Sequence, residues 1–116
     1  PQYKLEMLLE LRKRFKVYML SNTNPVMFPE MEKRYFSTNG HTLADYFDKA
    51  YLSYEMKMMK PDREIFEAVL EDAGISPDET LFIDDGKANI ETARQLGLNV
   101  YLAQEKEDYR HIFENL

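Results

Sequence analysis

This 116-residue sequence has no cysteine and no tryptophan, and it lacks long apolar runs and any excess of basic residues. Without cysteine, the chain cannot form disulfide bonds, zinc–thiolate sites or thiol nucleophiles. Its longest uninterrupted apolar stretches span only a few residues, far short of the roughly 20 that cross a bilayer. The formal net charge is −6, whereas nucleic-acid phosphates select basic surfaces. We therefore expect no nucleic-acid partner and no membrane association.

The first residues show no charged start followed by an apolar block, so the sequence opens with no signal-peptide pattern. We therefore expect a cytoplasmic protein. Hydrophobic residues make up 44% and aromatic residues 13% of the chain, which is the composition of a folded globular protein. At this length the sequence can build one core but not two.

Apolar periodicity and turn signals predict strands that alternate with helices along the chain. The predicted strands are residues 17–20, ending at or near Ser21, and residues 50–53, 81–84 and 99–103. The predicted helices are residues 3–15, 26–36, 43–47, 61–73 and 88–96, and a surface helix at 105–116. Pro61 would open the strongest helix and Gly74 would cap it. This alternation predicts a parallel sheet in an α/β fold.

The segment from Thr80 to Asn89 runs from apolar residues into two adjacent acids, Asp84 and Asp85, and then a glycine. Paired carboxylates repel each other, and removing them from water is costly unless a positive charge lies nearby. Mg²⁺ meets this need, because it binds one or two carboxylates together with waters and phosphate oxygens. Asp-Gly is also an ordinary turn signal, so this segment alone leaves a metal site and a solvated turn as equal alternatives.

Polar residues also follow the other predicted strands. Ser21 and Asn22 end the first strand, and Lys60 stands at the start of a helix after the second. Because ligands of open parallel sheets bind beyond the carboxyl ends of the strands, these residues and the acid pair would converge on one edge. Taken singly, Ser21 is better explained as a turn or helix cap, and Lys60 as a solvated lysine. Their combination and order favour a functional site.

Three segments, in this order, resemble the second, third and fourth motifs of the haloacid dehalogenase-like (HAD) superfamily. The matching residues are Leu20-Ser21-Asn22-Thr23, Lys60-Pro61-Asp62, and Phe82-Ile83-Asp84-Asp85 followed by Asn89. The resemblance covers nearly the whole chain and implies a Rossmann-like, three-layer α/β/α core with a parallel sheet. Within the superfamily, the chain is most similar to phosphatases with a small helical cap, of the sugar-phosphatase and epoxide-hydrolase N-terminal kind.

The resemblance implies a Mg²⁺-dependent phosphomonoester hydrolase in which an aspartate attacks the phosphoryl group and water hydrolyses the aspartyl phosphate. Ser21 Oγ and the backbone N–H of Asn22 would then bind phosphoryl oxygens. Lys60 would supply a fixed positive charge, which suits a reaction that depends on positioning and on neutralising negative charge. The implied substrate is a small phosphorylated metabolite such as a sugar phosphate.

The same resemblance assigns the metal site. Asp85 would be a direct ligand of Mg²⁺, Asp84 would reach a metal-bound water, and Asn89 would support the loop. These assignments make Ser21, Lys60 and Asp85 the catalytic residues of this chain.

The family's first motif, Asp-x-Asp at the end of a strand, occurs nowhere in these 116 residues, and the helical cap is absent too. That motif supplies the nucleophile, and its strand lies between the strands of the second and fourth motifs. We therefore expect residues 1–116 to be the C-terminal portion of a single core domain, with residues 1–15 as the helix that returns from the cap. An N-terminal segment of the same protein would supply the central strand, and this stretch alone would be inactive.

Three alternatives follow from the same residues. A metal-independent 2-haloacid dehalogenase would carry smaller neutral groups where this chain has Asp84 and Asp85. A receiver-type signalling domain has its acids before its lysine, which is the reverse of the order here. A non-catalytic HAD-like binding or scaffold protein that has lost its nucleophile stays open, because the nucleophile's motif is not among these residues.

Overall fold

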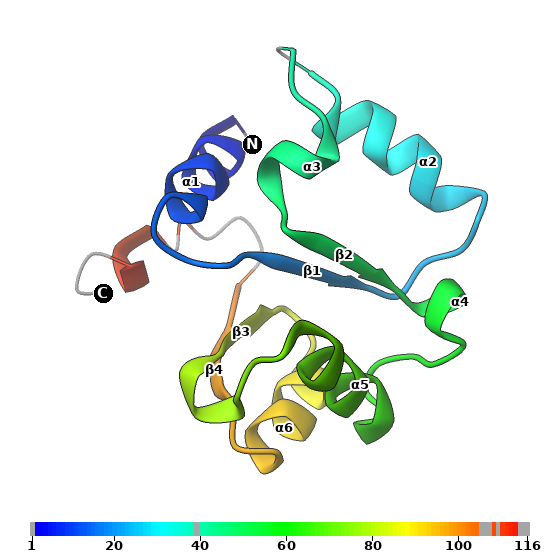
Figure 1. Cartoon of the computed structure of the whole chain (residues 1–116), viewed down its shortest axis with the longest axis vertical. Coiled ribbons are helices and arrows are strands. Elements are labelled where there is room, and N and C mark those ends of the chain that lie inside the picture. Colours follow the sequence, from blue (N-terminus) through cyan, green and yellow to red (C-terminus); the bar gives the residue numbers. More distant parts are fainter. Residues whose placement is uncertain (1, 39, 105–107, 109, 114–116) are drawn as a thin grey trace. The chain divides into compact units, whose positions relative to one another are not determined.

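The structure is a computed structural model that describes residues 2–38, 40–104, 108 and 110–113. It contains two compact units, the first within residues 1–57 and the second within residues 58–116 (Figure 1). Each unit is built around its own pair of parallel strands.

The first unit places helices around the strand pair β1–β2. Its elements are α1 (Gln2–Arg12), β1 (Tyr18–Ser21), α2 (Met27–Met31), the π-helical turn η1 (Glu32–Phe36), α3 (Leu43–Tyr46), β2 (Lys49–Leu52) and α4 (Ser53–Met56). The strands run in register from Tyr18 opposite Lys49 to Ser21 opposite Leu52. They lie side by side in Figure 1, and the loop that follows β1 leads into α2. The carboxyl ends of both strands therefore lie together.

Local chemistry explains where α2 begins. The side-chain oxygen of Asn24 accepts hydrogen bonds from the backbone N–H groups of Val26 and Met27, at 2.9 and 2.8 Å. It thereby satisfies donors that the first helical turn leaves without a helical partner. Pro29 is the third residue of α2, in the first turn, where a missing N–H removes no helical hydrogen bond.

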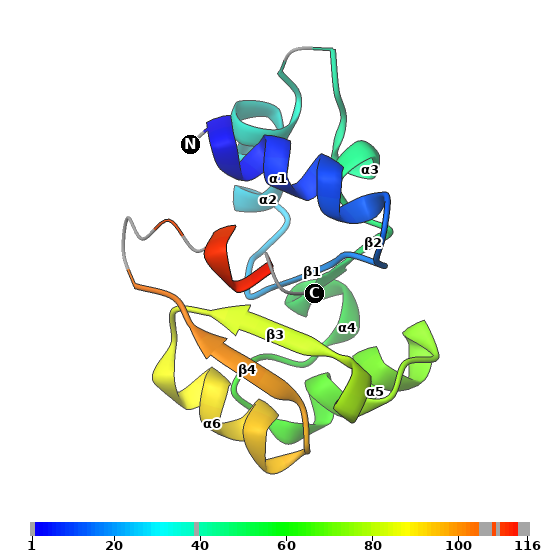
Figure 2. The same cartoon turned by 90° about the vertical axis from the view of Figure 1, so that its left-hand side faces the viewer.

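The second unit packs two helices on the strand pair β3–β4. Its elements are α5 (Arg63–Ala73), the 3₁₀ turn η2 (Pro77–Glu79), β3 (Leu81–Asp84), α6 (Lys87–Gln95), β4 (Asn99–Leu102) and the 3₁₀ turn η3 (Arg110–Phe113). Figure 2 shows α5 and α6 on the same side of the strand pair. The rings of Phe66 on α5 and Phe82 on β3 meet edge to face, with centroids 5.2 Å apart. This contact joins the helix layer to the sheet.

Most of the predicted elements are present, and the four strands lie within one residue of their expected bounds. The helix predicted from Pro61 begins only at Arg63, because the N–H of Asp62 bonds the carbonyl of Met59 at 2.9 Å and closes a turn first. Gly74 caps this helix as predicted, with a left-handed φ of +67°. The single turn α4 lies where a loop was expected. Its four residues are too few to show a helical period of apolar residues in the sequence.

The surface helix predicted at residues 105–116 falls partly outside the described residues. The described part contains only a 3₁₀ turn, from Arg110 to Phe113. Within the described ranges, no helix is long and apolar enough to cross a membrane. The parallel strands alternating with helices confirm the α/β class.

Candidate active site

Asp84, the last residue of β3, is the centre of a hydrogen-bonded cluster in the second unit. Its Oδ1 lies 3.0 Å from the ammonium of Lys60. Its Oδ2 accepts hydrogen bonds from the side-chain amide of Asn89 at 2.7 Å and from the backbone N–H of Gly86 at 3.0 Å. Both carboxylate oxygens therefore have donors.

This cluster keeps Asp84 charged although only 14% of its side chain is exposed. Burial alone raises the pKa of Asp84. The hydrogen bonds from Asn89 and Lys60, the positive charge of Lys60 and the N–H of Gly86 outweigh burial, so that the pKa lies below its ordinary value. A carboxylate with several donors and a nearby cation behaves in this way.

Lys60 is buried, with 9% of its side chain exposed. A buried ammonium is rare unless it is paired, and the ion pair with Asp84 provides that pairing. The ammonium also lies 5.9 Å from the centre of the Phe82 ring. Phe82 and Asp84 are two residues apart on β3, so their side chains share one face of the strand pair. Lys60 is therefore a fixed positive charge over the carboxyl end of β3.

Asp85 differs from Asp84 in its surroundings. It follows the last residue of β3 and is exposed. Among the described residues, no hydrogen bond or ion pair occupies its carboxylate. Two adjacent acids thus have separate environments, one held by a lysine and one open to solvent.

The donor set fits a magnesium site that is completed by other groups. Mg²⁺ is usually bound by one or two carboxylates, with waters and phosphate oxygens filling the remaining positions. In the described part of the chain, no group of three or more acidic or histidine side chains is placed to hold a metal ion. Asp85 can offer a direct carboxylate ligand, and Asp84 a carboxylate that is already oriented by Lys60 and Asn89. Further ligands would have to come from water, substrate or other residues.

Ser21 and Asn22 lie in the first unit, at the carboxyl end of β1. Ser21 is the last residue of the strand and is half-buried, whereas Asn22 is exposed. The next residue, Thr23, is held by the hydroxyl of Ser53, which accepts from its N–H at 2.9 Å and donates to its carbonyl at 3.1 Å. Sequence reasoning placed Ser53 only at the end of a strand and missed this contact.

The structure thus brings together one part of the predicted site. Lys60, Asp84 and Asn89 form a direct cluster, with Asp85 next to it in the chain. Ser21 and Asn22 occupy the expected strand end within their own unit. Their catalytic roles, and the convergence of the two groups, stay predictions.

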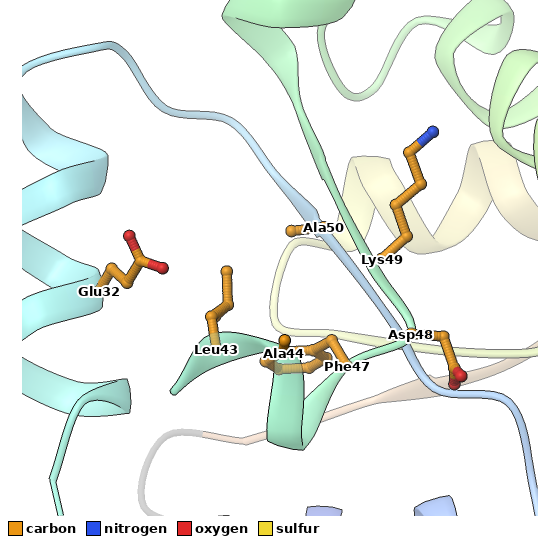
Figure 3. Close-up of a pocket in the computed structure, with 7 residues that line it drawn as sticks. All are labelled: Glu32, Leu43, Ala44, Phe47, Asp48, Lys49 and Ala50. Atoms are coloured by element: carbon orange, nitrogen blue, oxygen red, sulfur yellow. The ribbon is translucent and has the colours of Figure 1, made fainter. Parts of the chain in front are cut away.

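A hollow of about 240 Å³ lies elsewhere in the first unit. In Figure 3, Glu32, Leu43 and Ala50 point toward it, whereas Lys49 points away. Its residues surround the amino end of β2, opposite the carboxyl ends at which ligands of parallel sheets bind. The acid nearest to β2, Asp48, is already bonded to Arg12 and to the N–H of Val17. We assign no chemistry to this hollow.

Comparisons with known proteins show the family of the chain. The family profile of the haloacid dehalogenase-like hydrolases matches residues 1–97. D-ribitol-5-phosphate phosphatase from Bacteroides thetaiotaomicron is 43% identical over 107 residues, which are 92% of this chain and 52% of the phosphatase. The chain thus spans about half the length of this relative.

Solved structures show the same relationship. A HAD family enzyme from Bacteroides thetaiotaomicron, solved in complex with magnesium and inorganic phosphate, is 50% identical with a TM-score of 0.95. That match covers 98% of this chain and 58% of the enzyme. A predicted HAD-like family hydrolase from Porphyromonas gingivalis is 38% identical with a TM-score of 0.88, covering 99% of this chain and 56% of its own. The motif residues, the fold and the family match lead to one conclusion: the chain belongs to the haloacid dehalogenase-like hydrolases.

Proposed function

We propose that the protein containing this chain is a Mg²⁺-dependent phosphatase of small phosphorylated metabolites, with sugar or sugar-alcohol phosphates as the substrate class. The observation that carries the proposal is the Lys60–Asp84–Asn89 cluster beside the exposed Asp85, at the carboxyl end of a parallel strand. The similarity to a D-ribitol-5-phosphate phosphatase supports the substrate class. The magnesium and phosphate in a related enzyme support the cofactor.

In this proposal, Lys60 and the residues at the carboxyl end of β1 bind the transferred phosphoryl group. Ser21 Oγ and the N–H of Asn22 donate hydrogen bonds to phosphoryl oxygens, and Lys60 neutralises the charge on them. Such preorganised donors stabilise the transition state without reorganisation at the moment of reaction. Asp84 holds Lys60 in place through the 3.0 Å ion pair.

The acid pair would hold the metal. Asp85 would be the direct ligand, Asp84 would accept a hydrogen bond from a water on the metal, and Asn89 would keep Asp84 oriented. Bound there, Mg²⁺ would neutralise charge on the phosphoryl oxygens and orient them for in-line attack.

The nucleophile of this proposal comes from residues other than these 116, because they contain no Asp-x-Asp. We propose that an N-terminal segment of the same protein supplies it, on a strand between β1 and β3, together with the cap. Residues 1–116 would then be the C-terminal portion of one core domain, with residues 1–15 returning from the cap. We further propose a cytoplasmic protein that acts on free metabolites and not on nucleic acids or membranes.

The test is a phosphatase panel on the full-length protein with and without Mg²⁺. It includes D-ribitol 5-phosphate, several sugar phosphates and a 2-chloro acid. We expect turnover of phosphate esters that EDTA abolishes and added Mg²⁺ restores. Asp85→Asn and Lys60→Ala should each lower kcat about 10²- to 10³-fold, by analogy with the loss of one transition-state contact. Asp78→Asn, which neutralises an exposed acid in a distant turn of the same unit, is the matched control.

Each alternative has its own result. Near-normal turnover by Asp85→Asn would contradict the metal assignment. Metal-independent release of chloride would identify a dehalogenase instead. Binding of phosphate esters without turnover would favour the binding or scaffold protein.

A further inference from the structure

The loop after β1 is fixed on both sides of Asn22. On one side, Ser21 is the last residue of the parallel ladder, opposite Leu52. On the other, the side chain of Asn24 caps the start of α2 through two backbone N–H groups. Asn22 and Thr23 are the two residues between these fixed points.

Ser53 holds the backbone of Thr23. Its hydroxyl accepts from the N–H of Thr23 at 2.9 Å and donates to the carbonyl of Thr23 at 3.1 Å. One hydroxyl can make both bonds at once, since it has one donor and two acceptor positions. Ser53 is 9% exposed, so little water competes for these bonds. The two residues are 30 apart in sequence, and only the parallel register of β1 and β2 brings them together.

We propose that Ser53 is a positioning residue for phosphate binding. By clamping the backbone of Thr23, it fixes the peptide unit between Asn22 and Thr23. The ladder of β1 holds the other side of Asn22 through Ser21, so the two restraints together set the direction of the Asn22 N–H. The hydroxyl of Ser21 and the Asn22 N–H would bind phosphoryl oxygens. The proposal rests on the proposed phosphatase function and adds a residue that touches no substrate.

A purely structural role for Ser53 makes a different prediction. A residue that only stabilises the fold would change the melting temperature and leave the kinetics of the folded enzyme intact. A positioning residue would change phosphate binding and turnover in protein that is still folded. A small error in the placement of catalytic groups lowers rates about 10²-fold, so kinetics are the sensitive readout.

The experiment compares Ser53→Ala with wild type in the full-length protein, at a temperature well below the melting temperature of both. We expect kcat/KM to fall about ten- to a hundredfold, and the inhibition constant for inorganic phosphate to rise. The Mg²⁺ concentration for half-maximal activity should not change, because Ser53 is not one of the proposed metal-binding residues. Amide hydrogen exchange at Thr23 should become faster.

Three further variants separate the loss of the hydroxyl from a general loss of stability. Ser53→Thr retains the hydroxyl and should restore much of the activity. Ser53→Cys nearly keeps the volume but offers only a weak donor and acceptor, so its kcat/KM should fall below that of wild type. It provides the test if Ser53→Ala does not fold. Ser37→Ala is the matched control, because Ser37 also donates its hydroxyl to a backbone carbonyl, that of Glu32, in the same unit. It should leave kcat/KM unchanged.

The possible failures are distinguishable. Absence of turnover in wild type overturns the proposed function and, with it, the role of Ser53 in phosphate binding. An active wild type with folded Ser53→Ala or Ser53→Cys variants of unchanged kcat/KM and phosphate inhibition overturns the Ser53 proposal alone. Equal losses in Ser53→Ala and Ser37→Ala would overturn it too, since the effect would then be general.

Discussion

The environment of Asp84 depends on Gly86, which has no side chain. A Cβ atom at Gly86 would lie 2.7 Å from Asn89 Nδ2 and 3.1 Å from Asp84 Oδ2. The φ of Gly86 is −92°, which other residues adopt readily. Glycine is therefore required here by side-chain space and not by backbone strain. Any added atom would meet the hydrogen bond between Asn89 and Asp84.

We predict that Gly86→Ala displaces Asn89 from Asp84. The lost hydrogen bond to a charged group should destabilise the protein by about 1.5–3 kcal/mol and lower phosphatase activity. The measurement is urea unfolding and kcat of the full-length protein for Gly86→Ala, Asn89→Ala and the double variant. If both act on one contact, Gly86→Ala will cost much less in the Asn89→Ala background than alone. Additive free energies would show that the two positions act separately.

At the scale of elements, Asp48 joins α1, β1 and β2 within the first unit. Its Oδ2 accepts from the N–H of Val17 at 2.7 Å, just before β1, and its Oδ1 pairs with Arg12 of α1 at 2.9 Å. Arg12 also donates to the carbonyl of Ala44 in α3 at 2.6 Å. One carboxylate just before β2 thus ties the helix end to the start of the strand pair.

The charge of Asp48 gives this junction a pH dependence. Burial alone would raise the pKa of Asp48. The hydrogen bond from the N–H of Val17 and the hydrogen bond and charge of Arg12 outweigh burial, so that the pKa lies below 3.8. A depressed folded pKa stabilises the fold above the unfolded value and loses this effect as the pH falls through the folded value. The pKa of Asp84 is lowered as well, so its contribution to stability is lost in the same direction, as the pH falls.

We predict that Asp48→Asn destabilises the protein at pH 7 by about 1–3 kcal/mol, because the amide leaves one of the two donors without its acceptor. The variant should lose less stability than wild type as the pH falls below 3.8, since it has no Asp48 charge to neutralise. Urea unfolding at several pH values measures both effects. Glu10→Gln is the matched control, because its pair with Lys13 is about 70% exposed and exposed pairs contribute about 0–1 kcal/mol. Equal losses in the two variants would contradict the role of Asp48.

The helices and strands themselves were largely predictable, because each depends on residues close in sequence. Apolar spacing and Gly74 placed most elements within one or two residues. The errors concern helix ends and short turns. The helix predicted at residues 3–15 ends at Arg12, and the helix predicted at 26–36 is α-helical only from Met27 to Met31 and continues as the π-helical turn η1. The start of α5 was placed too early because Pro61 is a common first helical residue, while the backbone bond between Asp62 and Met59 is visible only in the structure.

At the scale of the molecule, the described strands form two separate pairs. Within the described residues, β1 pairs only with β2, and β3 only with β4. The strands β1 and β3 therefore each have one strand neighbour in this part of the chain. Our proposal of a further strand between them, carrying Asp-x-Asp, would give both a second neighbour.

We predict that residues 1–116 alone have no phosphatase activity, because the nucleophile is not among them. Activity should appear when the N-terminal segment of the full-length protein is co-expressed with this chain. The measurement is hydrolysis of p-nitrophenyl phosphate with Mg²⁺ by the chain alone, by the pair and by the full-length protein. Turnover by the 116 residues alone, if lost in Lys60→Ala, would contradict the proposed source of the nucleophile.

The sequence by itself determined the α/β class, the strand ends and the family, because hydrophobic period and motif order are local or linear properties. It also identified Lys60, Asp84 and Asn89 as candidates. Only the tertiary structure decided that these three side chains form one cluster, that Asp85 is exposed beside it, and that Ser53 holds Thr23. These contacts join residues 24 and 30 positions apart. Their distances depend on strand register and helix packing, which no local pattern specifies.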